Sequence, residues 1–338
     1  MPDVEQVRYS RPWHWVDDPT ALLRATTQNN KRRFKYPRWA EYWYWQRACR
    51  GQVFHAPNYF LPPYVENGVV TVHDLSALKF PETHPIERVK QFENLFRQTL
   101  DIASHLITDS EATRQEVIEY LGWPRERVTT VHLGVSPQFA PQSASQSAPV
   151  LQRYRLNPSG YSLCVSTIEP RKRIDSLLAA YARLPEKLRT AYPLLLVGGK
   201  GWRSEHLHKK IEVGQHAGWL RYLGFVPEED LPALYAGAKL FVYPSTYEGF
   251  GLPVVEAMVS GVPVITSNCS CLPEVAAHAA KLVNPDDLDS FSIMIEEALT
   301  DAEWRLRAIT DGLQVAARYD WAECARRTVD VYKRQFNS

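Results

Sequence analysis

The sequence has no long hydrophobic run and no excess of charge of either sign. No stretch of about eighteen apolar residues appears, so no transmembrane helix is expected. The 39 Lys and Arg residues balance 38 Asp and Glu residues, so no overall field favours nucleic acid. The opening stretch MPDVEQVRYSRPWHWVDD lacks the apolar core of a secretion signal. We therefore expect a cytoplasmic protein that binds no nucleic acid.

Cysteine is scarce and follows no metal-binding or disulfide pattern. The five cysteines are scattered, except for Cys269 and Cys271, and this pair lacks a second pair of ligands for zinc. A chain of 338 residues does not need disulfides to fold. A reducing compartment therefore fits best.

The length of the chain predicts two domains. Residues 141–149 read PQSASQSAP, which are small and polar residues without periodicity, so they predict a flexible connector. We place the first domain at 1–146 and the second at 147–320. A last helix, over 321–338, is expected to cross back to the first domain.

Strand-like runs alternate with helical patterns in both halves. In the first half these runs lie at 52–56, 68–74, 104–110 and 127–134. A helix between them is predicted by apolar residues at helical spacing, which are Val89, Phe92, Phe96, Ala103 and Leu106. In the second half the runs are YSLCVST, PLLLVGG, LRYLG, KLFVYPS and VPVIT.

Strands that are joined by crossover helices form parallel sheets, which are buried on both faces. The alternation therefore predicts an α/β fold with two Rossmann-like domains, whose parallel sheets face each other across a cleft. Ser110 is placed to cap a helix that ends near Gly122. Ligands of such sheets bind at the carboxyl ends of the strands.

Two glutamates flank a stretch that cannot be regular helix, YEGFGLPVVEAM. Glu248 follows a strand on a loop, and Glu256 is expected in the first turn of a helix beginning near Pro253. Gly249 and Gly251 let backbone N–H groups approach a phosphate closely. The carboxylates would instead accept hydrogen bonds from hydroxyls, so a nucleotide sugar fits both features. The alternative is that Glu256 caps its helix and Glu248 is solvated.

This stretch resembles the Glu-x7-Glu signature of the family 4 retaining glycosyltransferases of GT-B fold. The resemblance runs from about His55 to Tyr332. It rests on blocks in the family's order, which are HAPNYFLPP, TVHDLSALKFPETHP, STIEPRKRIDSLLAAY, LLLVGGKGW, YPSTYEGFGLPVVEAMVSGVPVITS and WAECARRTVDVY. Nothing before Arg32 resembles the family's opening strand and glycine-rich turn, so a shortened amino-terminal edge is expected.

The resemblance implies roles for single residues. Glu248 would contact the transferred sugar, and Glu256 would hold the ribose hydroxyls. Arg171 and Lys172 would neutralise the diphosphate, unless they form a solvated surface pair. His73 would contact the donor sugar and reach toward the acceptor, and Asp74 would orient backbone or histidine. The motif implies further donor-binding positions at Gly249, Phe250, Gly251, Leu252, Gly199 and Ser245.

Two other patterns suggest chemistry that we do not infer. Asp287 and Asp289 form an Asp-x-Asp pair, which binds metal in GT-A glycosyltransferases, but the pair lies where Asn284 or Asp286 begins an amphipathic helix. The Gly199-Lys200-Gly201 turn lacks a third glycine and the spacing of a Walker loop. We therefore expect a helix start, a strand-to-helix turn beside the cleft, and no metal or other cofactor.

A basic and aromatic stretch spans residues 30–50, which read NKRRFKYPRWAEYWYWQRACR. Aromatic residues among cations suit the interface of an anionic membrane. Their spacing of four is also that of a buried helix stripe formed by Trp39 and Trp43. We favour the buried stripe and keep the peripheral membrane contact as the alternative.

The sequence thus predicts a retaining, metal-independent hexosyltransferase. Its donor would be a nucleoside diphosphate sugar, and its acceptor a glycan or lipid-linked glycan of surface polysaccharide or lipopolysaccharide synthesis. The blocks HDLSALKFPE and STIEPRK most resemble mannosyl or rhamnosyl transferases, which favours GDP-mannose. The alternatives are a nucleotide-sugar epimerase of GT-B fold and a catalytically impaired nucleotide-binding partner.

Overall fold

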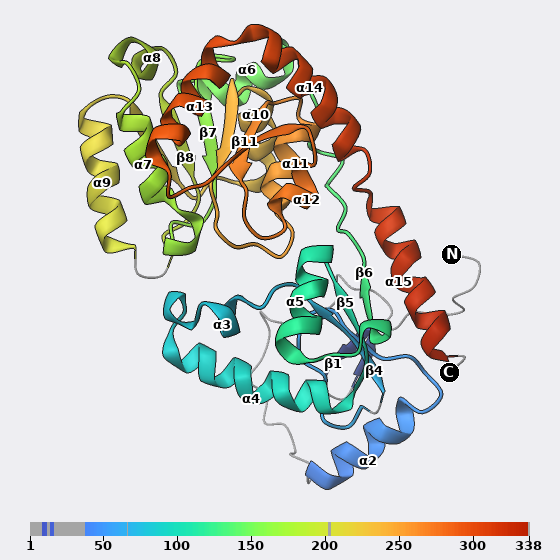
Figure 1. Cartoon of the computed structure of the whole chain (residues 1–338). Coiled ribbons are helices and arrows are strands. Elements are labelled where there is room, and N and C mark those ends of the chain that lie inside the picture. The colour runs from blue at the N-terminus through green and yellow to red at the C-terminus, as the bar shows by residue number, and fades with distance from the viewer. Residues whose placement is uncertain (1–8, 12–13, 17–37, 66, 202–203, 337–338) are drawn as a thin grey trace.

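The chain folds into two α/β lobes, each built on a parallel sheet (Figure 1). The computed structural model describes residues 9–11, 14–16, 38–65, 67–201 and 204–336. An extended segment after strand β6 connects the lobes, and helix α15 runs back beside it (Figure 1). The expected α/β architecture of two facing Rossmann-like lobes is confirmed.

The first lobe contains a four-stranded parallel sheet in the order β3-β4-β5-β6. Its strands are β3 (His55–Ala56), β4 (Gly68–Val72), β5 (Ala103–Thr108) and β6 (Val128–Thr130). Its helices are α2 (Arg38–Ala48), α3 (Ser76–Lys79), α4 (Ile86–Ile102), α5 (Glu111–Leu121) and the 3-10 turns η1 (Pro81–Thr83) and η2 (Arg125–Arg127). Two short strands, β1 (Tyr9–Arg11) and β2 (His14–Val16), pair with each other. β4 is buried along its whole length, as a parallel strand covered on both faces should be.

The predicted ends of α5 are confirmed, whereas the predicted apolar stripe of α4 extended too far. The Ser110 side chain accepts a hydrogen bond from the Thr113 N–H, and Gly122 ends α5 with a φ of 65°, as predicted. The extension of the α4 stripe to Ala103 and Leu106 was wrong, because both residues lie in β5. Short apolar runs fit a helix or a buried strand equally well.

The second lobe contains a six-stranded parallel sheet in the order β12-β11-β10-β7-β8-β9. Its strands are β7 (Ser162–Val165), β8 (Leu194–Val197), β9 (Leu220–Gly224), β10 (Leu240–Tyr243), β11 (Val264–Ser267) and β12 (Ala280–Val283). Its helices and turns are α6 (Ala144–Arg153), η3 (Pro170–Lys172), α7 (Ile174–Ala182), α8 (Glu186–Ala191), α9 (Glu205–His216), η4 (Glu228–Asp230), α10 (Leu231–Ala236), α11 (Leu252–Val259), α12 (Leu272–Ala276), α13 (Leu288–Thr300) and α14 (Ala302–Ala316). The strand order reverses between β7 and β10, and in open α/β sheets ligands bind at such a switch point.

The segment that was predicted to be a flexible connector is a helix. Ser143 and Gln146 form a capping box at the start of α6, and Leu151 is 1% exposed in the core of the second lobe. The Arg153 guanidinium binds Asp230, whose carboxylate is buried. A boundary at 146/147 would fall within this helix, which packs on the second lobe. The polar composition of this segment did not indicate a helix. The capping box and the buried Leu151 stabilise α6.

Helix α15 (Trp321–Phe336) leaves the second lobe and lies against the first (Figure 1). Val331 is fully buried with Val69 and Ile107, and the Tyr332 hydroxyl lies 2.5 Å from His55 Nδ1. The two crossing segments touch closely, because a Cβ atom at Gly134 would lie 2.3 Å from the Trp321 nitrogen. The lobes are thus joined twice.

Helix α2 does not bury the aromatic stripe that was expected. Trp39 and Trp43 are 74% and 63% exposed, whereas Trp45 is 1% exposed and stacks on Tyr64. The prediction failed because two faces of the helix carry tryptophan, and spacing alone does not say which face packs. The basic residues at 31–37 lie outside the described residues.

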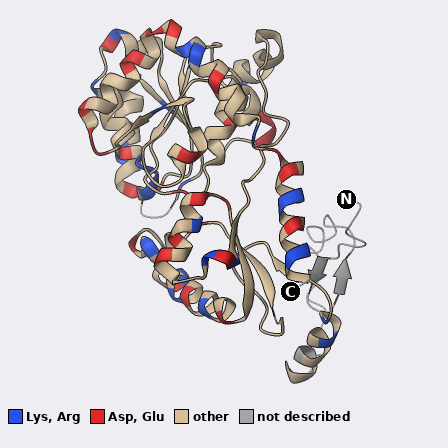
Figure 2. Ribbon diagram, turned by 45° about the vertical axis from the view of Figure 1, so that its right-hand side comes forward, with Lys and Arg blue, Asp and Glu red and all other residues tan. Residues whose placement is uncertain are grey.

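Acidic and basic residues are interspersed along the ribbon of both lobes in the described part of the chain (Figure 2). This distribution agrees with the net charge of +1 and leaves neither lobe with a field of one sign. Among the described residues, no helix combines the length and apolarity needed to cross a bilayer.

Candidate active site

A cavity of about 520 Å³ lies between the lobes at the carboxyl ends of their strands. Its volume falls in the range of small-molecule sites. The first lobe supplies His73, Asp74 and Asp109, which follow β4 and β5. The second lobe supplies the residues after β7, β8 and β10, on both sides of the switch point. The lining on this side includes Lys172, Gly199, Tyr243, Glu248, Gly249, Phe250, Gly251 and Leu252.

Glu248 is held at the centre of a buried polar cluster. Its Oε1 atom lies 2.5 Å from Lys172 Nζ and accepts a hydrogen bond of 2.8 Å from the Tyr243 hydroxyl. Burial alone would raise the pKa of Glu248, but the charges of Lys172 and Arg171 outweigh it and hold the pKa below its usual value. Glu248 is therefore a carboxylate at neutral pH, and it is paired rather than solvated.

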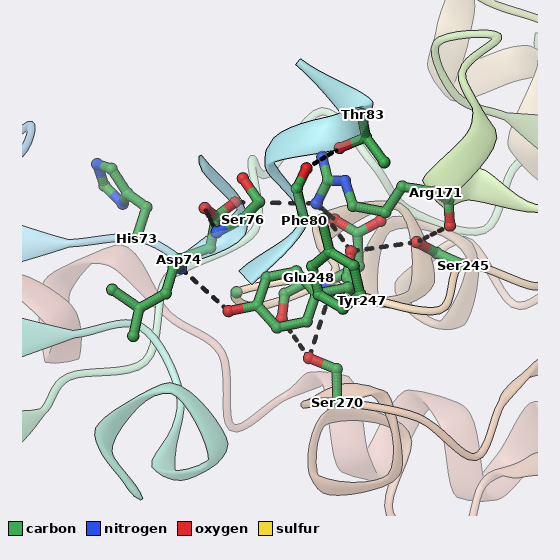
Figure 3. Close-up of polar contacts among 12 residues, drawn as sticks. His73, Asp74, Ser76, Phe80, Thr83, Arg171, Ser245, Tyr247, Glu248 and Ser270 are labelled. Carbon is green, nitrogen blue, oxygen red and sulfur yellow. Dashed lines mark hydrogen bonds and ion pairs between the residues drawn. The ribbon is translucent and has the colours of Figure 1, made fainter. Parts of the chain in front are cut away.

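Arg171 braces the loop that carries Glu248. Its Nη1 atom donates to the Tyr247 carbonyl at 2.8 Å and lies 3.9 Å from Glu248 Oε2. Its Nη2 atom binds Glu169 at 3.0 Å, and its own carbonyl accepts from the Thr246 N–H. Arg171 and Lys172 are therefore not a solvated surface pair, and the structure brings both together with Glu248. Figure 3 shows Arg171 beside Glu248.

The loop between Glu248 and α11 requires glycine at two positions. A Cβ atom at Gly249 would lie 1.8 Å from the His73 carbonyl oxygen, so the loop touches the end of β4. Gly251 has a φ of 101°, a conformation that side chains rarely adopt, and it precedes the first residue of α11. The N–H groups of the first turn of α11 therefore face the cavity that Gly251, Leu252 and Pro253 line.

Some expected donor-binding residues lie outside the lining of the cavity. Glu256 lies in the second turn of α11, not the first, and its Oε2 atom accepts a hydrogen bond of 2.8 Å from Tyr235. The Ser245 side chain is fully buried and bonds the carbonyls of Arg171 and Tyr247, so it holds the loop in shape. Gly199 does line the cavity, on the turn after β8.

His73 and Asp109 form a second polar pair, on the first lobe. His73 Nδ1 lies 2.7 Å from Asp109 Oδ2, and His73 Nε2 lies 2.9 Å from the Pro57 carbonyl oxygen. The hydrogen bond to Asp109 raises the pKa of His73. The His73 ring points away from Arg171 and Glu248 (Figure 3), whereas Asp74 accepts the Ser76 N–H and lies 3.8 Å from Arg171. Asp74 thus orients backbone, as expected.

Contacts across the cleft hold the two lobes together. The Tyr247 hydroxyl accepts the Leu75 N–H at 3.0 Å and donates to Glu116 Oε2 at 2.5 Å. The Glu274 carboxylate, on α12, accepts the N–H groups of Glu111 and Ala112 at 2.8 and 3.0 Å, so it caps the first turn of α5 in the other lobe. The lobes therefore meet through specific polar contacts beside the cavity.

Three residues at or beside the cavity were not predicted from the sequence, namely Asp109, Tyr243 and Glu274. Asp109 and Tyr243 could have been found, because each stands at the carboxyl end of a strand-like run, where ligands of parallel sheets bind. Glu274 gave no local signal, because its partners lie 163 and 162 residues away in the chain.

The Asp-x-Asp pair is a helix start, as predicted. Asp287 caps α13 by accepting the Ser290 N–H, and Asp289 binds Arg183 at 2.6 Å. In the part of the chain that the structure describes, no group of three or more His, Cys, Asp or Glu side chains is arranged to hold a metal ion.

Comparison with known proteins relates both lobes to glycosyltransferases. A family model described as glycosyl transferases group 1 matches residues 155–314, and one described as glycosyltransferase family 4 matches residues 5–139. O-antigen chain mannosyltransferase B of Escherichia coli is 44% identical over 287 residues, which cover 85% of this chain and 75% of that protein. Serotype-specific mannosyltransferase WbdA of Escherichia coli is 35% identical over 242 residues, which cover 70% of this chain but 29% of that protein.

Solved structures show the same fold. WaaG, a glycosyltransferase involved in lipopolysaccharide biosynthesis, superposes with a TM-score of 0.69 at 19% identity, covering 89% of this chain and 84% of that one. Sucrose-phosphate synthase from Thermosynechococcus elongatus superposes with a TM-score of 0.67 at 22% identity, covering 88% of this chain and 72% of that one. At these identities the likeness establishes the GT-B fold alone.

The expected shortening of the amino-terminal edge concerns residues that lie mostly outside the described part of the chain. The 44% identity over most of both chains and the two family models agree with the fold and with the blocks of the sequence. The chain therefore belongs to the family 4 glycosyltransferases of GT-B fold, and it is a hexosyltransferase.

Proposed function

We propose that the protein is a retaining mannosyltransferase of surface polysaccharide or lipopolysaccharide synthesis. It moves mannose, or a related sugar such as rhamnose, from a GDP-linked donor to a hydroxyl of a growing glycan or lipid-linked glycan. The observation that carries the proposal is the pairing of Glu248 with Lys172 in the cavity at the switch point. The names of the relatives, O-antigen chain mannosyltransferase B and mannosyltransferase WbdA, support the sugar.

The donor fits the cavity by charge. A departing nucleoside diphosphate develops negative charge, which Lys172, Arg171 and the N–H groups at the start of α11 can stabilise. The Lys172 ammonium is held by Glu248 and Tyr243, so little reorganisation is needed when phosphate binds. Because these cations can offset the charge, we propose that transfer needs no metal.

The acceptor hydroxyl attacks on the face from which the diphosphate leaves, so no protein nucleophile is required. Glu248 holds the transferred sugar, and Glu256 holds the ribose hydroxyls from the second turn of α11. His73 contacts the sugar from the first lobe. These three roles follow from the family pattern, and variants of each residue test them.

A donor screen tests the proposed function. Nucleoside diphosphate release is measured for GDP-mannose, UDP-glucose and UDP-N-acetylglucosamine, with and without a membrane extract as acceptor, and with a chelator added. We expect release that needs both GDP-mannose and extract, survives the chelator, and yields a product with the anomeric configuration of the donor. Preference for a UDP sugar would contradict the proposed donor, and inversion of the anomeric configuration would contradict retention. Loss of activity with the chelator would contradict metal independence. Conversion of GDP-mannose to an isomer without acceptor would indicate an epimerase.

We also propose that the protein contacts the inner face of the cell membrane peripherally, through α2. Trp39, Trp43 and Tyr44 are exposed on this helix, and Arg47 and Arg50 are exposed beside them. Aromatic side chains next to cations match the interface of an anionic bilayer. The contact would bring the cleft to lipid-linked acceptors.

A further inference from the structure

One carboxylate oxygen of Asp109 has no hydrogen-bond partner among the residues that the structure describes. The residue follows β5, is 3% exposed and lines the cavity. Its Oδ2 atom binds His73, but its Oδ1 atom is buried and has no hydrogen-bond partner among the described residues. Buried polar atoms are almost always paired, so an orphaned carboxylate oxygen on a cavity wall calls for a ligand.

The surroundings of Asp109 decide which ligand chemistry fits. A carboxylate oxygen only accepts hydrogen bonds, and Asp74 also lines this wall, so phosphate would be repelled. Burial raises the pKa of Asp109, but the hydrogen bond from His73 opposes that rise. His132 and Cys324 interact electrostatically with Asp109, and neither is hydrogen-bonded to it. A neutral hydroxyl donor meets these conditions.

The position of Asp109 in the cleft points to the sugar. Gly249 lies against the His73 backbone, so the wall formed by His73 and Asp109 adjoins the loop that carries Glu248. The apolar part of the lining, which includes Phe225, Val226 and Leu231, lies on the second lobe. A sugar between Glu248 and His73 would therefore present hydroxyls to Asp109.

We propose that Asp109 is a specificity-determining residue, which accepts a hydrogen bond from a hydroxyl of the transferred sugar through Oδ1 while Oδ2 fixes the His73 ring. The inference rests on the proposed function, because it takes a nucleotide sugar as the ligand. It adds a second acid to the sugar site, supplied by the lobe opposite Glu248. The nucleoside and the diphosphate make no contact with Asp109.

Binding calorimetry separates this role from turnover. Dissociation constants are measured for GDP and for GDP-mannose with the wild-type protein, Asp109→Ala and Asp109→Asn. We expect the affinity for GDP to stay within about twofold, while the Asp109→Ala variant loses about tenfold or more in affinity for GDP-mannose. An equal loss for both ligands, or no loss for either, would overturn the inference.

A double variant distinguishes contact from support of His73. If Asp109 touches the sugar, adding Asp109→Ala to His73→Ala weakens GDP-mannose binding further. No additional loss would reduce Asp109 to a residue that only orients His73. Monodeoxy GDP-mannose analogues give a third measure, because one of them should lose affinity for the wild-type protein and lose little for Asp109→Ala.

Asp230→Asn is a matched control for a buried aspartate. Asp230 is 2% exposed, but Arg153 and Tyr154 satisfy its carboxylate, and it lies outside the cavity lining. Its substitution should lower the melting temperature and leave the ratio of the two dissociation constants unchanged, whereas Asp109→Asn should change the ratio. If the wild-type protein binds another sugar nucleotide, the proposed donor fails, and the same ratio measured with that nucleotide still tests Asp109.

Discussion

The two lobes contribute to the cavity in different ways. On the second lobe the charged groups satisfy one another, because Glu248 binds Lys172 and Tyr243 while Arg171 binds Glu169 and a loop carbonyl. On the first lobe, one buried oxygen of the polar pair of His73 and Asp109 has no hydrogen-bond partner in the described part of the chain. The charged groups of the second lobe are thus preorganised in the absence of ligand. The first lobe instead offers a hydrogen-bond acceptor that a ligand can pair with.

The two halves of the site should therefore respond differently to substitution. A substitution in the paired cluster of the second lobe should lower catalysis. It should also destabilise the fold, because a buried charge then loses a partner in a region of low dielectric constant. Changing the first-lobe residues should alter recognition with less effect on stability. The following variants test this contrast.

Lys172→Ala should have the largest effect. Loss of a preorganised cation lowers turnover by about 10²–10³-fold, more than it weakens nucleoside binding. It also removes the nearer of the two cations beside the buried Glu248 and leaves only Arg171, at 3.9 Å, among the paired cations, so the free energy of unfolding should fall by up to about 3–5 kcal/mol. Steady-state kinetics and urea unfolding measure the two effects.

The double variant Lys172→Ala/Glu248→Gln is the control for stability. Because glutamine carries no charge, the double variant should be more resistant to urea than Lys172→Ala alone. If both variants unfold alike, the pairing of Glu248 is not what stabilises the loop. Equal losses of turnover and of nucleoside affinity in Lys172→Ala would argue that Lys172 only binds.

Glu256→Ala should weaken the binding of GDP itself by about tenfold or more, since a hydrogen bond to a charged group is lost. Tyr235→Phe is the matched variant, because it removes the one hydroxyl seen to donate to Glu256 and leaves the carboxylate. We expect it to have a smaller effect in the same calorimetric measurement. Unchanged affinity in Glu256→Ala would remove the ribose role.

Glu274→Gln should lower the free energy of unfolding by about 1 kcal/mol at neutral pH, because a charged cap on α5 becomes neutral. Burial would raise the pKa of Glu274, but the bonds from His132 and from two backbone N–H groups outweigh it and lower the pKa. The stabilisation is therefore present above the unfolded pKa and is lost as the pH falls through the folded value.

Thermal unfolding at several pH values measures this cap. The difference between the wild-type protein and Glu274→Gln should shrink from neutral pH to about pH 3. Glu303→Gln, on an exposed face of α14, should show no comparable pH-dependent difference. A difference that grows in acid would exclude a carboxylate cap between the lobes.

Trp39→Ser with Trp43→Ser should have the smallest effect on stability, within about 0.5 kcal/mol, because both side chains are exposed. The pair should nevertheless lose binding to vesicles that contain anionic lipid, as measured by co-sedimentation at low and high salt. Tyr120→Ser, an exposed aromatic on α5, is the control and should bind as the wild-type protein does. Unchanged vesicle binding in the double variant would contradict a membrane role for α2.

Much of the fold was predictable because its signals are local. The cap at Ser110, the glycine at 122 and the five apolar runs of the second half each depend on neighbouring residues in the chain. The same locality explains the errors. The polar run at 141–149 is a helix because of Leu151 and the second-lobe core, and Trp45 rather than Trp39 is buried because of Tyr64.

The candidate site was predictable only in part. The motif identified Glu248, Arg171 and Lys172, and the structure brings these three together. It could not reveal that Asp109 binds His73, or that Glu274 caps a helix of the other lobe. Such pairs depend on how two sheets are placed, which no local pattern encodes.

The order of residues determined most elements of secondary structure, the strand ends that carry polar side chains, and the family to which the chain belongs. The folded arrangement settled which charges are paired, which oxygen is left open, and how the lobes touch. The physical reason is range. Caps, turns and apolar periodicity act over a few residues, whereas burial and pairing of charge depend on atoms far apart in the chain that packing brings within hydrogen-bond distance.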